Sequence, residues 1–288
     1  MWQAIAQQLS ETLSIHYRIV EKEKLEGGEL HDCYVISDDT ERYFVKVNQR
    51  DFIHHYELEA ENLKLLAESQ SITVPIPILV GTTKNHAFII LNYLPTKPLD
   101  DPEQSYLFGQ QLAKLHQWGE QKEYGFDVEN HLGMLVQPNS WHKKWAIFFA
   151  EQRIGWQLQL LKEKGIDLVD IDEFVELIKQ KLGPHIPRPS LLHGALWSNN
   201  VAQSVMGPIA YDPACYWGDR ECDLAATELF GGFKPEFYQG YESAYPLDAR
   251  YEERKNIYNL YLLLSYCNHF GGRYLAQADA MIKNLLAN

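Results

Sequence analysis

The hydrophobic pattern of this chain changes character near residue 94, and that change limits the folds open to it. Before residue 94, β-branched and aromatic residues gather in short runs typical of strands, at residues 31–37, 42–47 and 86–93. Between the second and third runs, residues 53–66 carry aliphatic side chains at helical spacing. The first 94 residues are therefore expected to form a small β-rich lobe that contains one helix.

After residue 95 the patterns become long and helical, with strand-like stretches only at residues 190–193 and 208–212. The predicted helices of this part are residues 104–118, 141–164, 171–182 and 249–288. We therefore expect an α+β chain with two lobes, an N-lobe at residues 1–94 and a mostly helical C-lobe at residues 95–288, joined by a short link at residues 92–98. Interfaces between lobes commonly hold ligand clefts.

Composition narrows the function classes. The chain has 288 residues, which is enough to bury a core without metal or disulfide staples. Its 26 Lys and Arg residues against 39 Asp and Glu residues give a formal net charge of −13. Because binding to nucleic acid requires clustered cations that neutralise phosphates, we expect no nucleic-acid partner.

Cysteine use and hydropathy favour a soluble, cytoplasmic protein. The four cysteines form no C-x-x-C pair, which is typical of free thiols in a reducing compartment. The first residues include acidic side chains and lack the basic and apolar regions of a signal peptide. No apolar run reaches the roughly 18–20 residues that cross a bilayer. We expect no membrane association and a monomeric state.

Two signals in the N-lobe are typical of phosphate binding. Gly27 and Gly28 come just before a strand, and backbone N–H groups in such a turn can hold phosphate, although a hairpin turn is the simpler interpretation of a lone glycine pair. Lys46 lies among apolar strand residues and needs an anionic partner, which Glu59 in the following helix could supply. Such a Lys–Glu pair positions nucleotide phosphates in kinases. The alternative is an edge-strand lysine beside a solvated acidic helix.

The strongest signal lies in the C-lobe, around His193. Kinase chemistry uses a loop with His, an Asp two residues later and an Asn five residues after that, followed by a strand that ends in an Asp. His193, position 195, Asn200 and Asp212 have this spacing. Amide and carboxylate oxygens suit Mg²⁺. An incidental Asn and Asp become a poor explanation once the Lys–Glu pair precedes them in order.

Nearly the whole chain resembles the fructosamine kinase family, also called ketosamine-3-kinase-related proteins. Residues 191–200, LLHGALWSNN, are similar to the family's L-L-H-G-D-L-W-S-G-N. Residues 212–225, DPACYWGDRECDLA, are similar to its D-P-A-x-Y-Y-G-D-R-E-x-D-L-A. Further similar segments are residues 111–116, 124–126, 137–139 and 268–271. The resemblance implies a protein-kinase-like fold, with a small antiparallel sheet and one helix in the N-lobe and a larger helical C-lobe.

The resemblance also implies a reaction: ATP-dependent phosphorylation of a sugar hydroxyl on a ketosamine, with Mg²⁺ as the metal. A ketosamine is an amine already glycated by a reducing sugar, and it can be a small molecule or a protein side chain. Phosphorylation at O3 makes the adduct unstable, so the free amine is regenerated. This activity is deglycation.

In the N-lobe, the resemblance places Gly27 and Gly28 over the phosphates, with Lys46 and Glu59 orienting them. The hinge that meets adenine would be Asn92, Tyr93 and Leu94.

In the C-lobe, the resemblance makes Asn200 and Asp212 the Mg²⁺ ligands and places His193 in the catalytic loop. Trp197 and Asp219 are candidates for contact with the acceptor, although core packing also explains a single Trp. Asp219 begins a charged cluster that continues through residue 223, and such a cluster is more often a salt-bridge lattice that holds a loop.

The departure from the family pattern that matters most is Ala195, which stands where the family has Asp. Asn199, where the family usually has Gly, and Asn92, where it often has an acidic residue, are smaller departures. The family's Asp at position 195 is the group that accepts or orients the proton of the substrate hydroxyl, and a methyl group can do neither. General-base catalysis contributes ~10²–10⁴-fold, so we predict weak turnover with nucleotide binding preserved. Three explanations stay open: an engineered substitution, a natural pseudokinase loop, or a weaker base supplied by Asp219 or by His193 through water.

Two other functions also stay open. The chain could be a nucleotide-binding pseudokinase that acts as a regulatory module, which Ala195 favours. It could also be an aminoglycoside- or choline-type phosphotransferase, since an acidic chain suits a cationic acceptor.

Overall fold

The structure is a computed structural model that describes residues 1–26 and 30–287, so Gly27 and Gly28 lie outside the described residues. The chain forms two compact units. The first unit contains Met1–Leu99 and Val201–Pro213, and the second contains Asp100–Asn200 and Ala214–Asn288. The first segment of the first unit therefore extends five residues beyond the predicted boundary at residue 94. The hairpin within residues 201–213 also packs with the first unit.

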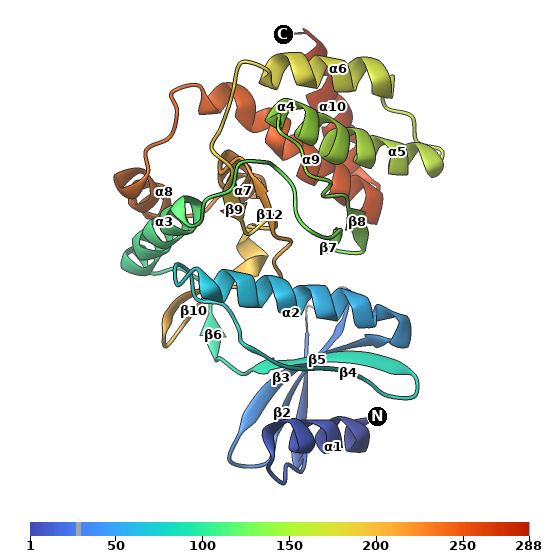
Figure 1. Cartoon of the computed structure of the whole chain (residues 1–288), viewed down its shortest axis with the longest axis vertical. Coiled ribbons are helices and arrows are strands. Elements are labelled where there is room, and N and C mark those ends of the chain that lie inside the picture. Colours follow the sequence, from blue (N-terminus) through green and yellow to red (C-terminus); the bar gives the residue numbers. More distant parts are fainter. Residues whose placement is uncertain (27–29, 288) are drawn as a thin grey trace. The chain divides into compact units, whose positions relative to one another are not determined.

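The first unit is built on a five-stranded antiparallel sheet with the strand order β1-β2-β3-β5-β4 (Figure 1). Its strands are β1 (Glu21–Leu25), β2 (Asp32–Ser37), β3 (Arg42–Gln49), β4 (Pro77–Thr82) and β5 (His86–Asn92). The three strands expected from the sequence are confirmed. The other two were missed because β1 is a run of alternating Glu and Lys, and β4 begins with Pro and is half-buried along its whole length.

Two helices pack on this sheet, one more than expected. The predicted helix is α2 (Ile53–Glu68), which follows a short 3-10 turn, η1 (Arg50–Phe52), and packs on β4 and β5. The added helix is α1 (Trp2–Leu13), whose buried Ile5 and Leu9 join Val45 and Val47 of β3 in one apolar cluster. Figure 1 shows α1 and α2 on opposite faces of the sheet. Lys46 lies on the opposite face of β3 from Val45 and Val47, which is the face toward α2.

A three-stranded sheet with the order β11-β10-β6 completes the first unit. Its strands are β6 (Thr96–Lys97), β10 (Val201–Ser204) and β11 (Gly207–Ala210). The strand expected at residues 208–212 ends at Ala210, because Asp212 has a left-handed φ of 56° that no strand accommodates.

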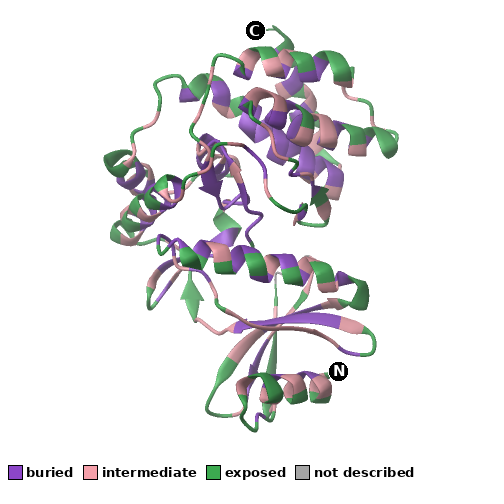
Figure 2. Ribbon diagram, in the orientation of Figure 1, coloured by how far each residue is buried: buried purple, intermediate pink, exposed green. Residues whose placement is uncertain are grey.

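The second unit is mainly helical, with two small antiparallel strand pairs. The pairs are β9 (Ser190–Leu192) with β12 (Tyr216–Gly218), and β7 (Asn130–Leu132) with β8 (Leu135–Gln137). The helices are α3 (Pro102–Gln117), α4 (Trp145–Phe149), α5 (Trp156–Glu163), α6 (Ile171–Leu182), α7 (Glu221–Glu228), α8 (Pro235–Ala244), α9 (Tyr251–Phe270) and α10 (Arg273–Ala287), with a 3-10 turn, η3 (Ser198–Asn200). Helix α9 packs against α5, α7 and α10 and forms the centre of the buried region (Figure 2).

Two predicted helices of this unit are interrupted. The helix expected at residues 141–164 begins at Trp145 and contains a π-helical turn, η2 (Ala150–Gly155), between α4 and α5. The helix expected at residues 249–288 divides into α9 and α10 at Gly271 and Gly272, whose φ angles of 59° and 57° end a right-handed helix.

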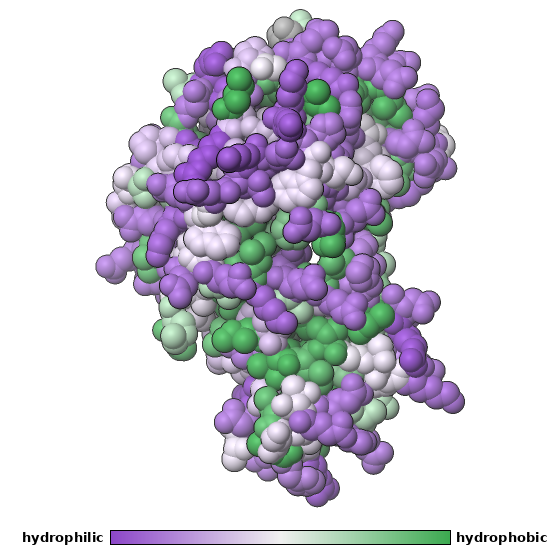
Figure 3. Space-filling model, viewed as in Figure 1, coloured by the Kyte–Doolittle hydropathy of each residue, from purple (hydrophilic) through white to green (hydrophobic). Residues whose placement is uncertain are grey.

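Helices α7 and α8 were not predicted, whereas α6 has the predicted bounds. The start of α6 is marked by Asp170, whose carboxylate accepts a hydrogen bond from the Glu173 N–H. On the face seen in Figure 3, hydrophilic side chains cover most of the second unit, with apolar side chains scattered among them. Within the described residues, every helix is too short or too polar to cross a membrane.

Candidate active site

The first unit gathers three charged residues that the sequence places far apart. Lys46 of β3 is buried on the α2 face of the sheet, and its Nζ lies 2.8 Å from Oε1 of Glu59 in α2. The same Nζ donates a hydrogen bond to Oδ1 of Asp212, which lies just beyond β11. The predicted ion pair between Lys46 and Glu59 is present, and Asp212 completes it as a triad.

The electrostatics of this triad keep Lys46 charged. Burial alone lowers the pKa of Lys46, but the nearby Asp212 and Glu59 carboxylates outweigh that effect and raise the pKa above its ordinary value. Burial raises the pKa of Glu59, although Lys46 opposes that rise. One cation is therefore shared by two carboxylates, which leaves an excess of negative charge suited to a divalent cation.

Asp212 is the accessible member of the triad. Its side chain is 45% exposed, whereas those of Lys46 and Glu59 are largely covered. A φ of 56° is uncommon for a residue other than Gly, and Asp is among the residue types that tolerate it. Sparsely populated backbone conformations of this kind gather at ligand sites.

His31 is a neighbour of the triad that the sequence reasoning did not select. Its Nδ1 lies 3.0 Å from Oη of Tyr56 and 3.3 Å from Nδ2 of Asn48. Burial, with a smaller contribution from Lys46, lowers the pKa of His31 from 6.5 to about 4. The imidazole is therefore neutral near pH 7 and adds no second positive charge beside Lys46. No spacing in the sequence marks this role.

The predicted hinge lies at the end of β5. Oδ1 of Asn92 accepts a hydrogen bond from the Ile76 N–H at 2.6 Å, and the Asn92 N–H donates to the Ile76 carbonyl at 3.0 Å. Asn92 therefore ties β5 to the segment that enters β4. Tyr93 and Leu94 follow, half-buried. Their contact with adenine stays a prediction.

In the second unit, a buried carboxylate holds the loop that begins at His193. Asp223 of α7 accepts hydrogen bonds from the backbone N–H groups of His193 and Gly194, at 2.7 and 2.9 Å. The His193 carbonyl in turn accepts from the Ala214 N–H at 2.8 Å. Gly194 has a φ of 80°, and a Cβ there would lie 2.0 Å from the Ala214 carbonyl oxygen. This position therefore requires glycine.

Two further residues support Asp223, and they were missed by sequence reasoning. Nε2 of His116 in α3 lies 3.1 Å from Oδ2 of Asp223, and Nδ1 of His116 lies 2.8 Å from Oη of Tyr241 in α8. All three side chains are buried. The His116 ring therefore lies between the Asp223 carboxylate and the Tyr241 hydroxyl and links α3 to both. His116 ends the segment 111–116 that carries the family resemblance, which was the available signal.

Ala195 lies in the same loop, two residues after His193. Ala195 is only 2% exposed and packs with the apolar core of the second unit. Its carbonyl accepts a hydrogen bond from Nδ2 of Asn200 at 2.9 Å. Because Nδ2 of Asn200 donates this bond, the side-chain oxygen of Asn200 points away from the Ala195 carbonyl. That oxygen is the atom that a metal ion would bind. Asn200 and Asp212 belong to different units, so their joint binding of Mg²⁺ stays a prediction.

Asp219 lies in a buried network of hydrogen bonds. Its Oδ2 accepts from Oη of Tyr258 at 2.6 Å and lies 2.7 Å from Nε2 of His185, and its Oδ1 accepts from the Glu221 N–H at 3.1 Å. Glu221 is held by two hydrogen bonds from Arg254, at 2.8 and 2.7 Å. These contacts favour the lattice interpretation of the charged cluster. Acceptor contact or proton transfer by Asp219 stays a prediction that its burial opposes.

The residues His185, Asp219 and Glu221 also bring three ligand atoms within 4.8 Å of one another. The double hydrogen bond from Arg254 already satisfies the Glu221 carboxylate, and burial raises the pKa of Glu221. The Arg254 guanidinium, with Nη2 2.7 Å from Oε1 of Glu221, would repel a metal ion at that carboxylate. The cluster is therefore better suited to holding the loop than to holding a cation.

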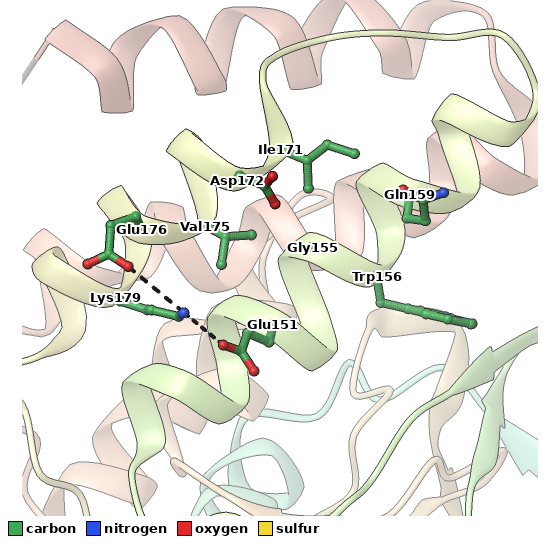
Figure 4. A pocket seen from close by; sticks show the side chains of 9 residues that line it. All are labelled: Glu151, Gly155, Trp156, Gln159, Ile171, Asp172, Val175, Glu176 and Lys179. Carbon is green, nitrogen blue, oxygen red and sulfur yellow. Dashed lines mark ion pairs between the residues drawn. The ribbon is translucent and has the colours of Figure 1, made fainter.

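A separate cavity of about 570 Å³ lies in the second unit between α6 and the segment formed by η2 and α5 (Figure 4). Lys179 spans it and lies 2.7 Å from Oε1 of Glu151. Trp156 points away from this ion pair. None of the predicted site residues lines this cavity.

Comparison with known proteins supports the same family. The family model described as fructosamine kinase matches residues 1–288. A "probable ketoamine kinase" of Vibrio parahaemolyticus is 66% identical over 287 residues, which cover 100% of each chain. The crystal structure of a "putative fructosamine-3-kinase" from Haemophilus somnus has a TM-score of 0.95 at 40% identity and covers 99% of this chain and 98% of that one.

A more distant similarity concerns the fold alone. The crystal structure of the choline kinase LicA from Streptococcus pneumoniae has a TM-score of 0.66 at 16% identity and covers 99% of each chain. The full-length match to the family model, together with relatives of this identity, leads to one conclusion: the chain belongs to the fructosamine kinase family and has a protein-kinase-like fold.

Proposed function

We propose that this protein is an ATP-dependent kinase that phosphorylates a sugar hydroxyl on a ketosamine. The observation that carries the proposal is the triad of Lys46, Glu59 and Asp212, in which a buried cation is paired by a helix carboxylate and by an accessible carboxylate. A lysine held in this way meets nucleotide phosphates, and the accessible carboxylate binds the metal that bridges them. Membership of the fructosamine kinase family supports a ketosamine as the acceptor.

The donor atoms fit Mg²⁺. Asp212 offers a carboxylate that solvent reaches, and Asn200 offers an amide oxygen whose orientation is set by the hydrogen bond to Ala195. Both are the hard oxygen ligands that Mg²⁺ prefers. Bound Mg²⁺ would neutralise charge on the transferred phosphoryl group.

The reaction moves one phosphoryl group. The bond between the γ-phosphorus and the bridging oxygen of ATP breaks and releases ADP, a new bond forms between that phosphorus and the sugar oxygen, and the hydroxyl proton passes to water. In this chain Ala195 offers no acceptor for that proton, and the loop around it is otherwise held in place by Asp223 and Asn200. We therefore propose that turnover is weak while nucleotide binding is retained.

The test compares the chain with Ala195→Asp and with the matched control Ala195→Asn. With a synthetic fructosamine as acceptor, coupled ADP release should rise by ~10²–10⁴-fold in the Asp variant, because a general base is restored. The Asn variant has nearly the same shape but cannot take the proton, so its rate should stay near that of the parent. A folded Asp variant that binds nucleotide but is inert on every ketosamine tried would overturn the acceptor assignment.

Ala195 also favours a second candidate, a nucleotide-binding pseudokinase that regulates a partner. Stabilisation by Mg-ATP without turnover, in both the parent and the Asp variant, is its expected signature. An aminoglycoside- or choline-type acceptor is a third candidate, and a panel of these alcohols beside ketosamines decides it. Full-length similarity to ketoamine kinases favours the ketosamine over both.

A further inference from the structure

An aromatic cluster in the second unit extends from the catalytic loop to the surface. Trp197, two residues after Ala195, contacts Tyr266 of α9 edge to face, with ring centroids 5.8 Å apart. Tyr266 lies 4.7 Å from Phe230, 5.6 Å from Phe270 and 5.2 Å from Tyr274. Centroid distances of this size are typical of favourable aromatic pairs. We call Tyr266, Phe230, Phe270 and Tyr274 the aromatic platform.

The platform is open to solvent at two of its rings. Phe230 is 40% exposed and Phe270 is 49% exposed, which is unusual for Phe. Each is followed by a glycine pair with positive φ angles, residues 231–232 and residues 271–272. A Cβ at Gly231 or Gly271 would meet nothing within 4 Å, so no neighbouring atoms cover the chain there. Grouped exposed aromatic rings of this kind mark interaction sites.

A positive charge already occupies one edge of the platform. The Arg273 guanidinium lies 5.0 Å from the ring centroid of Tyr274, and its Nη2 donates to Oη of the same residue at 3.1 Å. Tyr274 therefore has its cation–π partner, and Arg273 repels a further cation at this edge. The exposed rings of the platform, Phe230 and Phe270, suit an uncharged aromatic or apolar group.

We propose that the aromatic platform binds the group carried on the amine of the ketosamine, with a preference for uncharged aromatic or apolar groups. Trp197 connects the platform to the loop where the sugar hydroxyl would react, so an acceptor with its sugar at the loop can extend along Tyr266. This inference rests on the proposed function, because it assigns the second half of the same acceptor. It makes Phe230, Tyr266 and Phe270 specificity residues.

The test measures binding by calorimetry in the presence of Mg²⁺ and a non-hydrolysable ATP analogue. The two probes are fructosamines that carry a benzyl group or a methyl group on nitrogen. The test variant is Phe230→Ala/Phe270→Ala, and the control is Ile186→Ala, which removes an 88% exposed apolar side chain elsewhere in the same unit. The melting temperature of each variant is measured as well, to check that the variant is folded.

We expect the parent chain to bind the benzyl compound about tenfold more tightly than the methyl compound, because the benzyl ring gains aromatic contacts that the methyl group cannot make. The double variant should lose that preference and bind the methyl compound as before, and Ile186→Ala should behave like the parent. Equal affinity for both compounds in the parent, or a preference kept in the double variant, overturns the platform alone. Binding of neither compound overturns the proposed function as well.

Discussion

Lys46 shows how one residue sets the electrostatics of the first unit. A buried ammonium is costly unless it is paired, and here two carboxylates pair it. The neutral state of His31 belongs to the same balance, because burial and the nearby Lys46 both disfavour a second positive charge. Among the described residues, His31 therefore adds no second positive charge beside Lys46 near pH 7.

The lowered pKa of His31 predicts a pH-dependent stability. The unfolded chain binds a proton at His31 below about pH 6.5, whereas the folded chain does so only near pH 4. Between these values the unfolded state holds more protons, so the free energy of unfolding falls as the pH falls. From pH 7 to pH 5 the loss from this group should be about 2 kcal/mol.

Urea unfolding at pH 7 and pH 5 measures this loss. His31→Gln should reduce the fall by about 2 kcal/mol, the share of this group. The share of His55 and His269, whose pKa values burial also lowers, should remain, and the exposed control His54→Gln should keep the whole fall. An equal fall in the parent and in His31→Gln would show that His31 does not carry the effect.

At the scale of elements, a few contacts place the loop between β9 and η3. Asp223 of α7 holds the loop backbone, His116 of α3 holds Asp223, and Tyr241 of α8 holds His116. Helix α3 thus joins two helices from a distant part of the sequence, α7 and α8, in support of one loop. Gly194 allows the loop to pass against Ala214.

Two glycines with nearly the same φ angle provide a matched test of that packing. Gly194 has a φ of 80° and Gly165 a φ of 79°, but a Cβ at Gly165 would meet nothing within 4 Å. Gly165→Ala should cost about 1–2 kcal/mol for the left-handed conformation alone. Gly194→Ala should cost clearly more, because its Cβ would overlap the Ala214 backbone.

The measurement is the free energy of unfolding in urea for both variants. If the two substitutions destabilise the protein equally, the close approach of the loop to Ala214 is wrong.

At the scale of the whole molecule, the path of the chain decides where Asp212 lies. The chain leaves the first unit after Leu99 and returns to it at Val201–Pro213. This return brings Asp212 to Lys46 across a separation of 166 residues. Lys46 and Glu59 precede residues 100–200 in the chain, and Asp212 follows them. The candidate phosphate site of the first unit is therefore assembled from two segments that the second unit separates in sequence.

Nucleotide binding should stabilise the protein through this site. At a Mg-ATP concentration 100 times the dissociation constant, ligand binding contributes about 2.7 kcal/mol, which raises the melting temperature by about 5 °C. Asp212→Asn should lose most of this rise, because it removes the carboxylate proposed to bind the metal.

The matched control is Asp279→Asn, which changes a carboxylate on α10 that pairs with the exposed Lys283. It should keep the full rise. A full rise in Asp212→Asn would contradict the role of Asp212 in metal and nucleotide binding.

The sequence by itself determined the class of the protein and the order of its chemical groups. Runs of β-branched and aromatic residues predicted three strands of the sheet, and aliphatic residues at helical spacing predicted helix α2, because these elements carry buried apolar side chains. The spacing of His193, Asn200 and Asp212 predicted a kinase loop, because that chemistry needs fixed residue types at fixed intervals. The departure at Ala195 was also readable from the sequence alone.

Only the tertiary structure decided how these groups are held. The hydrogen bond from Lys46 to Asp212, the support of Asp223 by His116 and Tyr241, and the contact of His31 with Tyr56 all join segments separated in sequence. Strand β1 and helices α7 and α8 likewise form through packing against other elements rather than through a local pattern. Local hydrophobic patterns record which face of an element is buried, whereas partner choice and desolvation arise only when distant segments meet.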